Sequence, residues 1–497
     1  MTATADIGTA AGRSLEDTIF TREIAIPAAV VVLGAITTIL DATIVNVALA
    51  RLGQEFGTQI STIQWVATAY LLAFAAVIPL TGWAADRFGA KRVWLASLTV
   101  FLAGSALCAA AQSIEWLIAA RVVQGLGAGM ILPLGQAILA VAAGPRRMGR
   151  VMGVVGVPML LAPIFGPVLG GAIVDGSSWR WIFVVNLPVG LVALAAAARL
   201  LPPAAAGHRE RLDLAGALLA AGGSVLLVYG LAEVGSRGSL TAPLPAGLLV
   251  GGAGLLALFV RHALRTERPL IDVRLFGRRG FGAAATTTFL LGVALFGMLM
   301  ALPLFFQIAR GDSPLDAGLL MVPQALGAAV AMPLAGVLTD RLGARRVIPA
   351  GIALALMGTG VYTQLTAEAS AGTLAAALFV IGLGLGATIM PSMAVAYASV
   401  PGDAVARATS ALNTVQRLAG SVGTALIAVV LQRALDTRLP AVGGLSEAAA
   451  LQPAARAAAA PQLTEAFAVC FTVALVVGAC ALVPALALPS IRRHQGL

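Results

Sequence analysis

The sequence predicts an all-α, polytopic membrane protein with about fourteen membrane-spanning helices. Of its 497 residues, 59% are apolar and only 11% are charged, whereas soluble domains contain about 45–50% apolar and about 25% charged residues. The apolar residues gather in runs of about 20, the length that a helix needs to cross a hydrocarbon core of ~30 Å. Because lipid-exposed backbone must satisfy its own hydrogen bonds, continuous runs of this length predict helices.

Each expected helix is one apolar run that is long enough to span the core. Six runs precede residue 202, two form an inserted pair, and six complete the chain. In order they are 24–50, 63–81, 93–112, 114–140, 150–174, 181–201, 212–234, 244–264, 281–308, 317–338, 347–366, 373–399, 407–433 and 463–489.

These runs predict the organisation of the chain. It consists of a cytosolic segment 1–23, a six-helix bundle 24–201, a linker 202–280 with the two extra helices, a second six-helix bundle 281–489 and a cytosolic tail 490–497. The Ala- and Pro-rich stretch 434–462 is expected to be a low-complexity outer loop.

The distribution of Lys and Arg orients the chain in the membrane. An even number of helices puts both termini on one side. If that side is the cytosol, 23 of the 32 Lys and Arg fall in inner segments and seven in outer ones. The positive-inside rule predicts this bias. The formal charge of +10 therefore belongs to inner loops and does not indicate nucleic acid. We expect a multi-pass protein of the plasma (inner) membrane with cytosolic termini.

Several kinds of enzyme site are missing from the sequence. The lone lysine, Lys91, lies in GAKR and not in the Gly-rich run of a P-loop, so ATP is not expected as the energy source. Three histidines and three cysteines are scattered along the chain, which argues against a metal site or a disulfide framework. We therefore expect no cofactor, no metal and no catalytic residues.

The chain repeats itself. PLTGWAADRFGAKRV at 79–93 and PLAGVLTDRLGARRV at 333–347 match at nine of fifteen positions, with a shift of 254 residues. GLGAG at 125–129 and GLGLG at 382–386 are shifted by 257. Six helices need about 200 residues, so the surplus of about 50 accounts for the inserted pair. Parallel halves of this kind are common in secondary transporters.

Several motifs, taken in order, resemble the major facilitator superfamily and, within it, the fourteen-helix drug:proton antiporter group (DHA2-type). The resemblance runs from about residue 24 to 433. It is carried by LDATIVNVALA (40–50, with Ala50 where Pro is usual), GWAADRFGAKR (82–92), RVVQGLGAG (121–129), GPVLGG (166–171), WRWIFVVNLPVG (179–190), PLIDVRLF (269–276), SPLDAGLLMVP (313–323) and GVLTDRLGARR (336–346). It implies two six-helix bundles, alternating access, and efflux driven by a proton gradient.

Asp41 and Arg121 are charges inside apolar runs. On insertion scales a carboxylate at this depth costs about 2.5–3.5 kcal/mol, so it is normally kept for function or paired. Asp41 lies nine residues before the outer end of the first run and Arg121 lies seven residues into the fourth, which gives both a depth of roughly 10–14 Å. This permits pairing. The pair could simply hold two helices together. The resemblance instead implies that Asp41 carries the proton and that Arg121 shifts the pKa of Asp41. The 257-residue shift carries Arg121 onto Leu378, so proton chemistry is expected in the first half only.

Other polar residues within apolar runs are candidates for a substrate cavity. Arg417 could contact substrate or extend its cation toward the cytosol. Gln136 and Gln324 could line the cavity or form interhelical hydrogen bonds. The predicted cavity residues are Asn413, Gln416, Arg417, Gln136 and Gln324.

Two further motifs have predicted roles. The glycines and proline of GPVLGG permit close helix packing, and the resemblance implies that they seal the cavity against leak; they are Gly166, Pro167, Gly170 and Gly171. The inner-loop motif could reflect topology alone, whereas the resemblance implies a latch between the halves. Its residues are Gly82, Asp86, Arg87, Gly89 and Arg92 in the first copy and Gly336, Asp340, Arg341 and Arg346 in the second.

The expected function is proton-coupled export of a lipophilic, monocationic or neutral drug or antibiotic. Dications are less expected because the tenth and thirteenth runs lack a central Asp or Glu. Two alternatives remain open: export of lipid or of an endogenous natural product, and, with less support, import of a nutrient. The expected partners are the small amphiphilic substrate, protons and membrane lipid.

Overall fold

The computed structural model describes residues 22–202, 211–365, 369–401, 404–440, 444–449 and 451–489, and these residues form helices and connecting turns without a strand. Within these ranges, thirteen helices are long and apolar enough to cross a membrane. The predicted fold class is therefore confirmed: this is an all-α, multi-pass membrane protein. Most of the predicted segments 1–23 and 490–497 lies outside the described residues.

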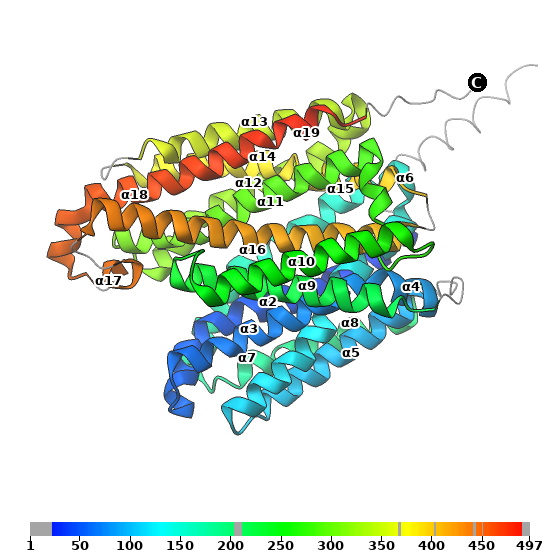
Figure 1. Ribbon diagram of the computed structural model, residues 1–497, viewed down its shortest axis with the longest axis horizontal. Helices are drawn as coiled ribbons and strands as arrows, with labels where there is room; N and C mark the ends of the chain where they lie inside the picture. Colours follow the sequence, from blue (N-terminus) through cyan, green and yellow to red (C-terminus); the bar gives the residue numbers. More distant parts are fainter. Residues whose placement is uncertain are drawn as a thin grey trace, which may run out of the picture.

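The helices form two bundles that lie side by side (Figure 1). The N-terminal bundle contains α2 (Arg22–Phe56), α3 (Ile60–Val77), η1 (Ile78–Leu80), α4 (Thr81–Phe88), α5 (Ala90–Ala109), α6 (Ile114–Gly176), α7 (Trp181–Val184) and α8 (Asn186–Leu200). The C-terminal bundle contains α11 (Arg279–Leu304), η3 (Phe305–Ala309), α12 (Pro314–Leu342), α13 (Ala344–Thr363), α14 (Ala371–Gly386), α15 (Ile389–Ala398), α16 (Val405–Arg438), α17 (Leu445–Ala449), α18 (Pro453–Cys480) and α19 (Leu482–Leu486), preceded by the short η2 (Val273–Gly277).

The break between the predicted fourth and fifth helices is shorter than the predicted gap of residues 141–149. α6 comprises both predicted helices, which meet at Gly144, where φ is 64° and ψ is 172°. A residue with positive φ breaks a right-handed helix, and glycine adopts this conformation without a steric penalty. One residue therefore makes the turn that we expected to need nine. The predicted segment 150–174 forms the second part of α6, and several of its side chains lie outside the described residues.

The predicted outer loop 434–462 is also largely helical. α16 continues to Arg438, α17 occupies Leu445–Ala449, and α18 begins at Pro453. Alanine has the highest helix propensity of the residues, and proline is favoured in the first turn of a helix. The same Ala- and Pro-rich composition that suggested a low-complexity loop thus suits the start of α18.

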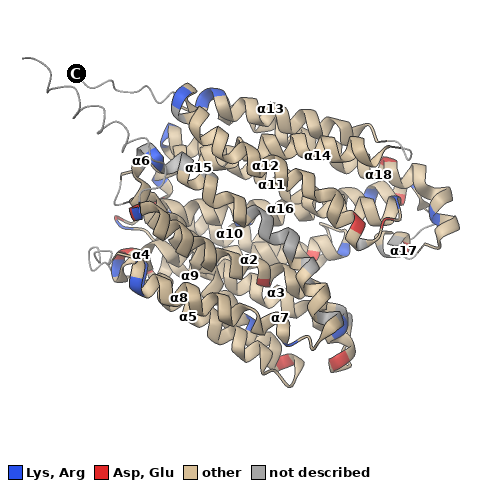
Figure 2. Ribbon diagram, turned by 180° about the vertical axis from the view of Figure 1, so that it is seen from behind, with Lys and Arg blue, Asp and Glu red and all other residues tan. Residues whose placement is uncertain are grey.

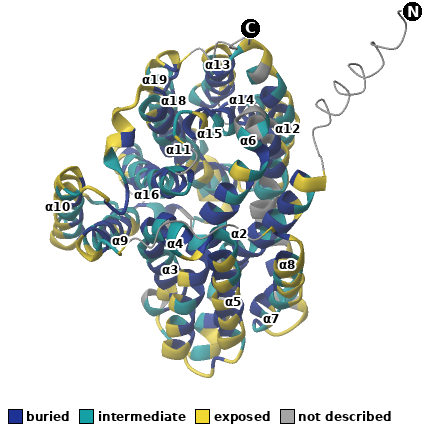
Figure 3. Ribbon diagram, turned by 90° about the vertical axis from the view of Figure 1, so that its right-hand side faces the viewer, coloured by how far each residue is buried: buried dark blue, intermediate teal, exposed yellow. Residues whose placement is uncertain are grey.

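The inserted pair consists of α9 (Leu214–Arg237) and α10 (Pro243–Arg265). α9 packs against α3 of one bundle and α16 of the other, whereas α10 packs mainly against α9. The pair therefore projects from one side of the molecule (Figure 3). Trp65 of α3 contacts Tyr229 of α9, with ring centroids 5.5 Å apart. Val234 of α9 is buried in a cluster with Ala425 and Val429 of α16.

The two bundles repeat in detail. α5 and α13 each have 20 residues and follow a glycine with positive φ, Gly89 at 88° and Gly343 at 84°. α6 and α14 each begin after a serine cap, Ser113 and Ser370. Corresponding helices also approach closely at corresponding glycines. A Cβ on Gly129 would lie 2.6 Å from the Phe74 carbonyl oxygen, and one on Gly386 would lie 2.6 Å from that of Ala328. The shifts of 254 and 257 residues therefore hold in three dimensions.

Most Lys and Arg residues lie at one end of the helices (Figure 2). This is the end at which α4 ends and α13 begins, and it contains the described basic residues of the two inner-loop motifs. The positive-inside rule predicts that this basic end faces the cytosol.

Candidate functional site

Asp41 and Arg121 form an ion pair inside the N-terminal bundle. Arg121 Nη1 of α6 donates to Asp41 Oδ2 of α2 at 2.6 Å. The side chains are 0% and 1% exposed, respectively. The two charges lie where the hydrophobic faces of α2 and α6 meet, so each is the principal compensation for the other.

Neutral polar side chains complete the network around Asp41. Its Oδ1 accepts from Gln124 Nε2 and from Asn186 Nδ2, both at 2.8 Å. Gln124 also accepts from Arg121 at 2.6 Å. Ser105 accepts from Gln124 at 3.2 Å and from Asn186 at 3.1 Å. Four helices, α2, α5, α6 and α8, thus contribute polar groups to a buried network in which both carboxylate oxygens are bonded.

Arg121 also contacts two groups of α3. Its Nε donates to the Val66 carbonyl at 3.0 Å, and its guanidinium carbon lies 4.1 Å from the ring centroid of Tyr70. One turn along α3, the Phe74 ring lies 4.1 Å from the guanidinium carbon of Arg417. Since Arg417 belongs to α16, this face of α3 lies between the buried ion pair and a cation of the other bundle.

The energetics make this network sensitive to charge. An anion and a cation that are buried together compensate each other, whereas removal of one partner leaves an uncompensated buried charge at a cost of about 3–5 kcal/mol. Protonation of Asp41 would likewise remove the negative charge. The geometry can therefore couple the charge of one carboxyl group to the positions of α2, α3 and α6.

A second set of contacts joins the bundles at the basic end. Arg407 Nε of α16 donates to Asp86 Oδ2 of α4 at 2.8 Å, and Ser410 Oγ donates to the Ile78 carbonyl at 2.6 Å. Gly82 is required for this approach, because a Cβ there would lie 2.8 Å from Arg407 Cα. The first copy of the inner-loop motif thus lies directly against the other half.

The remaining residues of the two inner-loop copies are placed differently. In the first copy Gly89 is buried, Arg87 is half-buried and Arg92 is exposed. In the second copy Gly336 is buried, Arg341 and Arg346 are exposed, and the side chain of Asp340 lies outside the described residues.

The predicted cavity residues do not gather in one place. Asn413 Nδ2 donates to Gln136 Oε1 at 2.8 Å, and both residues are buried, so this pair is a hydrogen bond between the bundles. Gln416 points toward Met393, with Nε2 and Sδ 3.9 Å apart. Arg417 faces α3, as described. Gln324 lines a separate cavity inside the C-terminal bundle.

The GPVLGG glycines pack α6 against α2. A Cβ on Gly166 would collide with Thr43, and one on Gly170 would lie 3.2 Å from the Ile44 carbonyl oxygen. Gly171 has open space at this position. The side chain of Pro167 lies outside the described residues. Because Thr43 and Ile44 are two and three residues from Asp41, this packing fixes the segment that holds the carboxylate.

The sequence analysis missed four side chains of the network, Ser105, Gln124, Asn186 and Tyr70. Gln124 had a usable signal, because it follows Arg121 by three residues and therefore lies on the same helix face. Asn186 lies in the WRWIFVVNLPVG motif, but the motif alone does not indicate a function for this asparagine. Ser105 and Tyr70 are ordinary residues in membrane helices, and nothing in the sequence alone distinguishes them.

Comparisons with known proteins are consistent with this architecture. A family model described as Major Facilitator Superfamily matches residues 31–424. The chain is 39% identical over 485 residues to "Multidrug resistance protein B homolog" of Mycobacterium tuberculosis, with 93% of this chain and 89% of the relative covered. It is 33% identical over 395 residues to "Putative multidrug resistance protein MdtD" of Klebsiella pneumoniae, with 79% and 83% covered.

Two solved structures share the fold. The human organic anion transporter MFSD10 has a TM-score of 0.61 at 17% identity, with 93% of this chain and 99% of that chain covered. The proton:xylose symporter XylE has a TM-score of 0.56 at 14% identity, with 92% and 95% covered. At these identities the likeness concerns the fold alone.

Proposed function

Because the chain belongs to the major facilitator superfamily, we propose that it is a secondary transporter that exports lipophilic drugs or antibiotics in exchange for protons. The names of its relatives support multidrug efflux, and the order of the antiporter motifs supports export. The basic end would face the cytosol, together with both termini. The contacts of Asp86 and Ser410 would then close the cytosolic side, and they must break before the interface can open inward.

The observation that carries the proton coupling is the buried pair of Asp41 and Arg121. When Asp41 is ionised, it neutralises Arg121 and holds α2 against α6. When Asp41 takes up a proton, Arg121 keeps its positive charge inside an apolar bundle, which is unfavourable. The helices then gain stability by moving so that Arg121 meets water or another partner. A proton thus drives the rearrangement through the change in charge of one carboxyl group.

The charges at the interface favour neutral over cationic substrates. Asp41 is already neutralised, and its two oxygens are occupied by protein donors. Arg417 adds a positive charge beside α3, and no carboxylate of the described residues pairs with it. A monocation would meet electrostatic repulsion there, and a dication would meet more. Of the monocationic and neutral molecules expected from sequence, neutral lipophilic ones are therefore the first candidates.

The test is proton movement in proteoliposomes that contain a pH-sensitive dye. Neutral, monocationic and dicationic compounds are added to the wild-type protein and to Asp41→Asn, which retains the shape of the carboxyl group. A neutral compound should move protons only with the wild-type protein. If the variant transports with an unchanged proton signal and is only less stable, the ion pair serves only to hold the two helices together. If wild-type protein moves substrate without protons, antiport is excluded.

A further inference from the structure

Two arginines lie at the ends of a row of aromatic rings on α3. Arg121 of α6 stacks on Tyr70, with its guanidinium carbon 4.1 Å from the ring centroid. The Tyr70 and Phe74 rings follow each other along α3, with centroids 6.1 Å apart. The guanidinium carbon of Arg417, on α16 of the other bundle, lies 4.1 Å from the centroid of the Phe74 ring. These four side chains, here called the α3 column, connect the buried ion pair to the opposite bundle.

Glycines of α6 hold the two rings of the column in place. A Cβ on Gly125 would collide with the Tyr70 carbonyl, and one on Gly129 would lie 2.6 Å from the Phe74 carbonyl oxygen. Arg121, Gly125 and Gly129 follow one another at intervals of four residues, so they lie on one face of α6. This face of the RVVQGLGAG motif therefore positions α3, and with it both rings, against α6.

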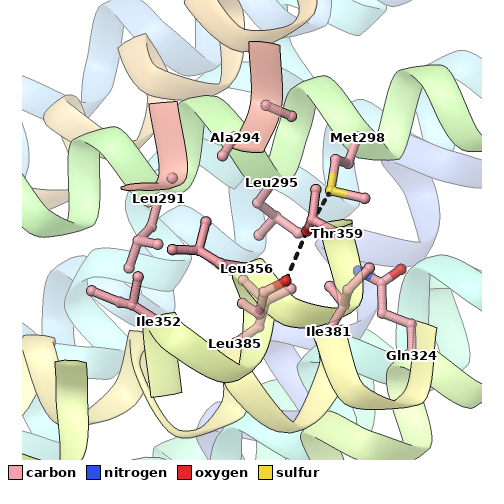
Figure 4. Close-up of a pocket in the computed structure, with 13 residues that line it drawn as sticks. Leu291, Ala294, Leu295, Met298, Gln324, Ile352, Leu356, Thr359, Ile381 and Leu385 are labelled. Atoms are coloured by element: carbon pink, nitrogen blue, oxygen red, sulfur yellow. Dashed lines mark hydrogen bonds between the residues drawn. The ribbon is translucent and has the colours of Figure 1, made fainter. Parts of the chain in front are cut away.

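The C-terminal bundle repeats the glycines but not the column. Glycines with the same spacing recur in α14, where a Cβ would meet the backbone of α12. The shift of 254 residues, however, carries Tyr70 onto Gln324 and Phe74 onto Ala328. Figure 4 shows Gln324 in its surroundings, where no charged or aromatic side chain lines the space between the helices. Helix packing alone therefore does not require the column, which belongs to the half that contains the ion pair.

The contact between Arg417 and Phe74 is the weaker end of the column. At the other end, Arg121 has an ion pair with Asp41 in addition to its contact with Tyr70. Arg417 has no carboxylate partner among the described residues, and it meets Phe74 through a cation–π contact. Its side chain is only partly buried, so it can exchange the ring for water.

The net charge of the column depends on Asp41. When Asp41 is ionised, it compensates Arg121, and Arg417 is left as the net charge of the column. When Asp41 is neutral, two cations face each other across two aromatic rings. Charges in an apolar interior are screened much less than charges in water. Their repulsion opposes the contact between Arg417 and Phe74, and movement of Arg417 into water relieves it.

The groups that face Asp41 make it the residue that switches this charge. The charged or titratable side chains on the helices around it are Arg121 of α6, Tyr70 of α3 and Cys108 of α5, whose thiol lies 3.6 Å from Gln124. α8 contributes the neutral Asn186. Arginine keeps its charge, and tyrosine and cysteine are ordinarily neutral at neutral pH.

We propose that protonation of Asp41 releases Arg417 from Phe74, so that the α3 column transmits the charge of the ion pair to the interface between the bundles. Phe74 is a positioning residue in this step, because it touches neither Asp41 nor the proton but holds a cation of α16 near the ion pair. The use of this release to separate the bundles rests on the proposed function, whereas the release itself does not.

Fluorine NMR of the full-length protein in lipid nanodiscs tests the release at the ring itself. 4-Fluorophenylalanine is incorporated in place of Phe74, and its chemical shift is followed as the pH is lowered. Arg417→Gln supplies the reference signal of a ring without its cation. In the otherwise unchanged protein, the signal should move toward this reference as the pH falls. In Asp41→Asn, which cannot carry the negative charge, it should lie near the reference at every pH.

A double variant separates charge repulsion from packing. Asp41→Leu, Arg121→Leu removes both charges of the ion pair, so no cation repels Arg417. Its signal should therefore stay away from the reference at every pH. The matched control is the same label at Phe296 of α11, whose ring lies beside Gly420 of α16 but outside the column. The control signal should not change with pH.

The proposal is overturned if the signal at Phe74 does not change with pH, or if it changes equally in Asp41→Asn. It is also overturned if the double variant gives the reference signal, because packing and not repulsion would then hold Arg417 in place.

Proton movement in proteoliposomes tests the column separately from the proposed function. Phe74→Leu should lose most of the proton movement that accompanies substrate, whereas Phe74→Tyr retains a ring and should keep it. Full proton movement in Phe74→Leu would overturn the role of the column in transport. If the NMR signals behave as expected while substrate moves without protons, the release stands and the proposed function fails. If protons move with substrate but the signal at Phe74 is constant, the column fails and the proposed function stands.

Discussion

The interiors of the two bundles occupy equivalent positions but differ in chemistry. In the N-terminal bundle, Asp41 and Arg121 lie at the centre of a fully bonded polar network. In the C-terminal bundle, the shifts of 254 and 257 residues place Leu295 and Leu378 at these positions. The helix arrangement around them, here called the frame, is the same in both bundles, including the glycines at which neighbouring helices touch. The comparison teaches that the same helix arrangement can enclose either a buried ion pair or apolar side chains, and that among the described residues the buried carboxylate lies in the N-terminal bundle.

The largest expected effect comes from breaking the ion pair on one side. Arg121→Leu leaves Asp41 buried without its cation and should lower the free energy of unfolding by about 3–5 kcal/mol. Unfolding in mixed micelles titrated with denaturing detergent measures this change. The double variant Asp41→Leu, Arg121→Leu copies the C-terminal bundle and should recover most of the lost stability. No recovery would mean that the two interiors are not interchangeable.

A smaller effect is expected from a neutral member of the network. Gln124→Leu removes donors and acceptors to both charges and introduces the kind of side chain that Ile381 provides in the other half. Hydrogen bonds to charged groups contribute about 1.5–3 kcal/mol each, so a loss of about 2 kcal/mol is expected from the same detergent titration. Ile381→Leu is the matched control and should change stability by less than about 1.5 kcal/mol. Equal losses would contradict a special role for the polar network.

The shared frame can be tested at its glycines. A Cβ on Gly129 or on Gly386 meets a carbonyl oxygen of the adjacent helix at the same distance, 2.6 Å. Gly129→Ala and Gly386→Ala should therefore lower stability by similar amounts, about 1–3 kcal/mol each. Thermal unfolding of the two purified variants provides the comparison, and Gly254→Ala, where a Cβ has open space, is the control. A loss confined to one half would show that the frames have diverged.

The smallest expected change concerns the contact between Asp86 and Arg407. Both side chains are about a fifth exposed, so this pair contributes at most about 1 kcal/mol. Asp86→Asn should leave overall stability nearly unchanged but should widen the distribution of distances between spin labels at the ends of α4 and α16. Arg341→Gln, at an exposed position of the other copy, should not. An unchanged distribution in Asp86→Asn would contradict a latch at this point.

The fold was predictable because a helix needs about 20 apolar residues to cross the hydrocarbon core of a bilayer. Every predicted run is helical among the described residues, since an apolar run of about 20 has few alternatives in a bilayer. The breaks were harder to predict. Gly144 interrupts α6 with a single residue, and the Ala-rich start of α18 resembles a loop in composition alone. Such details depend on one backbone conformation or on local helix propensity, and hydropathy reports neither.

The candidate site was predictable only at charged residues, because a charge inside an apolar membrane segment is energetically unfavourable. Asp41, Arg121 and Arg417 stood out because charges are rare in apolar runs. Gln124, Asn186 and Ser105 did not, since neutral polar residues occur in membrane helices for many reasons. Gln324 was noticed, but its surroundings were not, because a cavity arises from what several distant residues together fail to fill.

The inserted helix α9 links the two bundles on one side of the molecule. α9 contacts α3 and α16 and so covers the seam between the halves on that side, while the other seam runs where α6 meets α12. As long as α9 keeps its contacts with α3 and α16, the two bundles can separate along this side only if α9 moves with one of them.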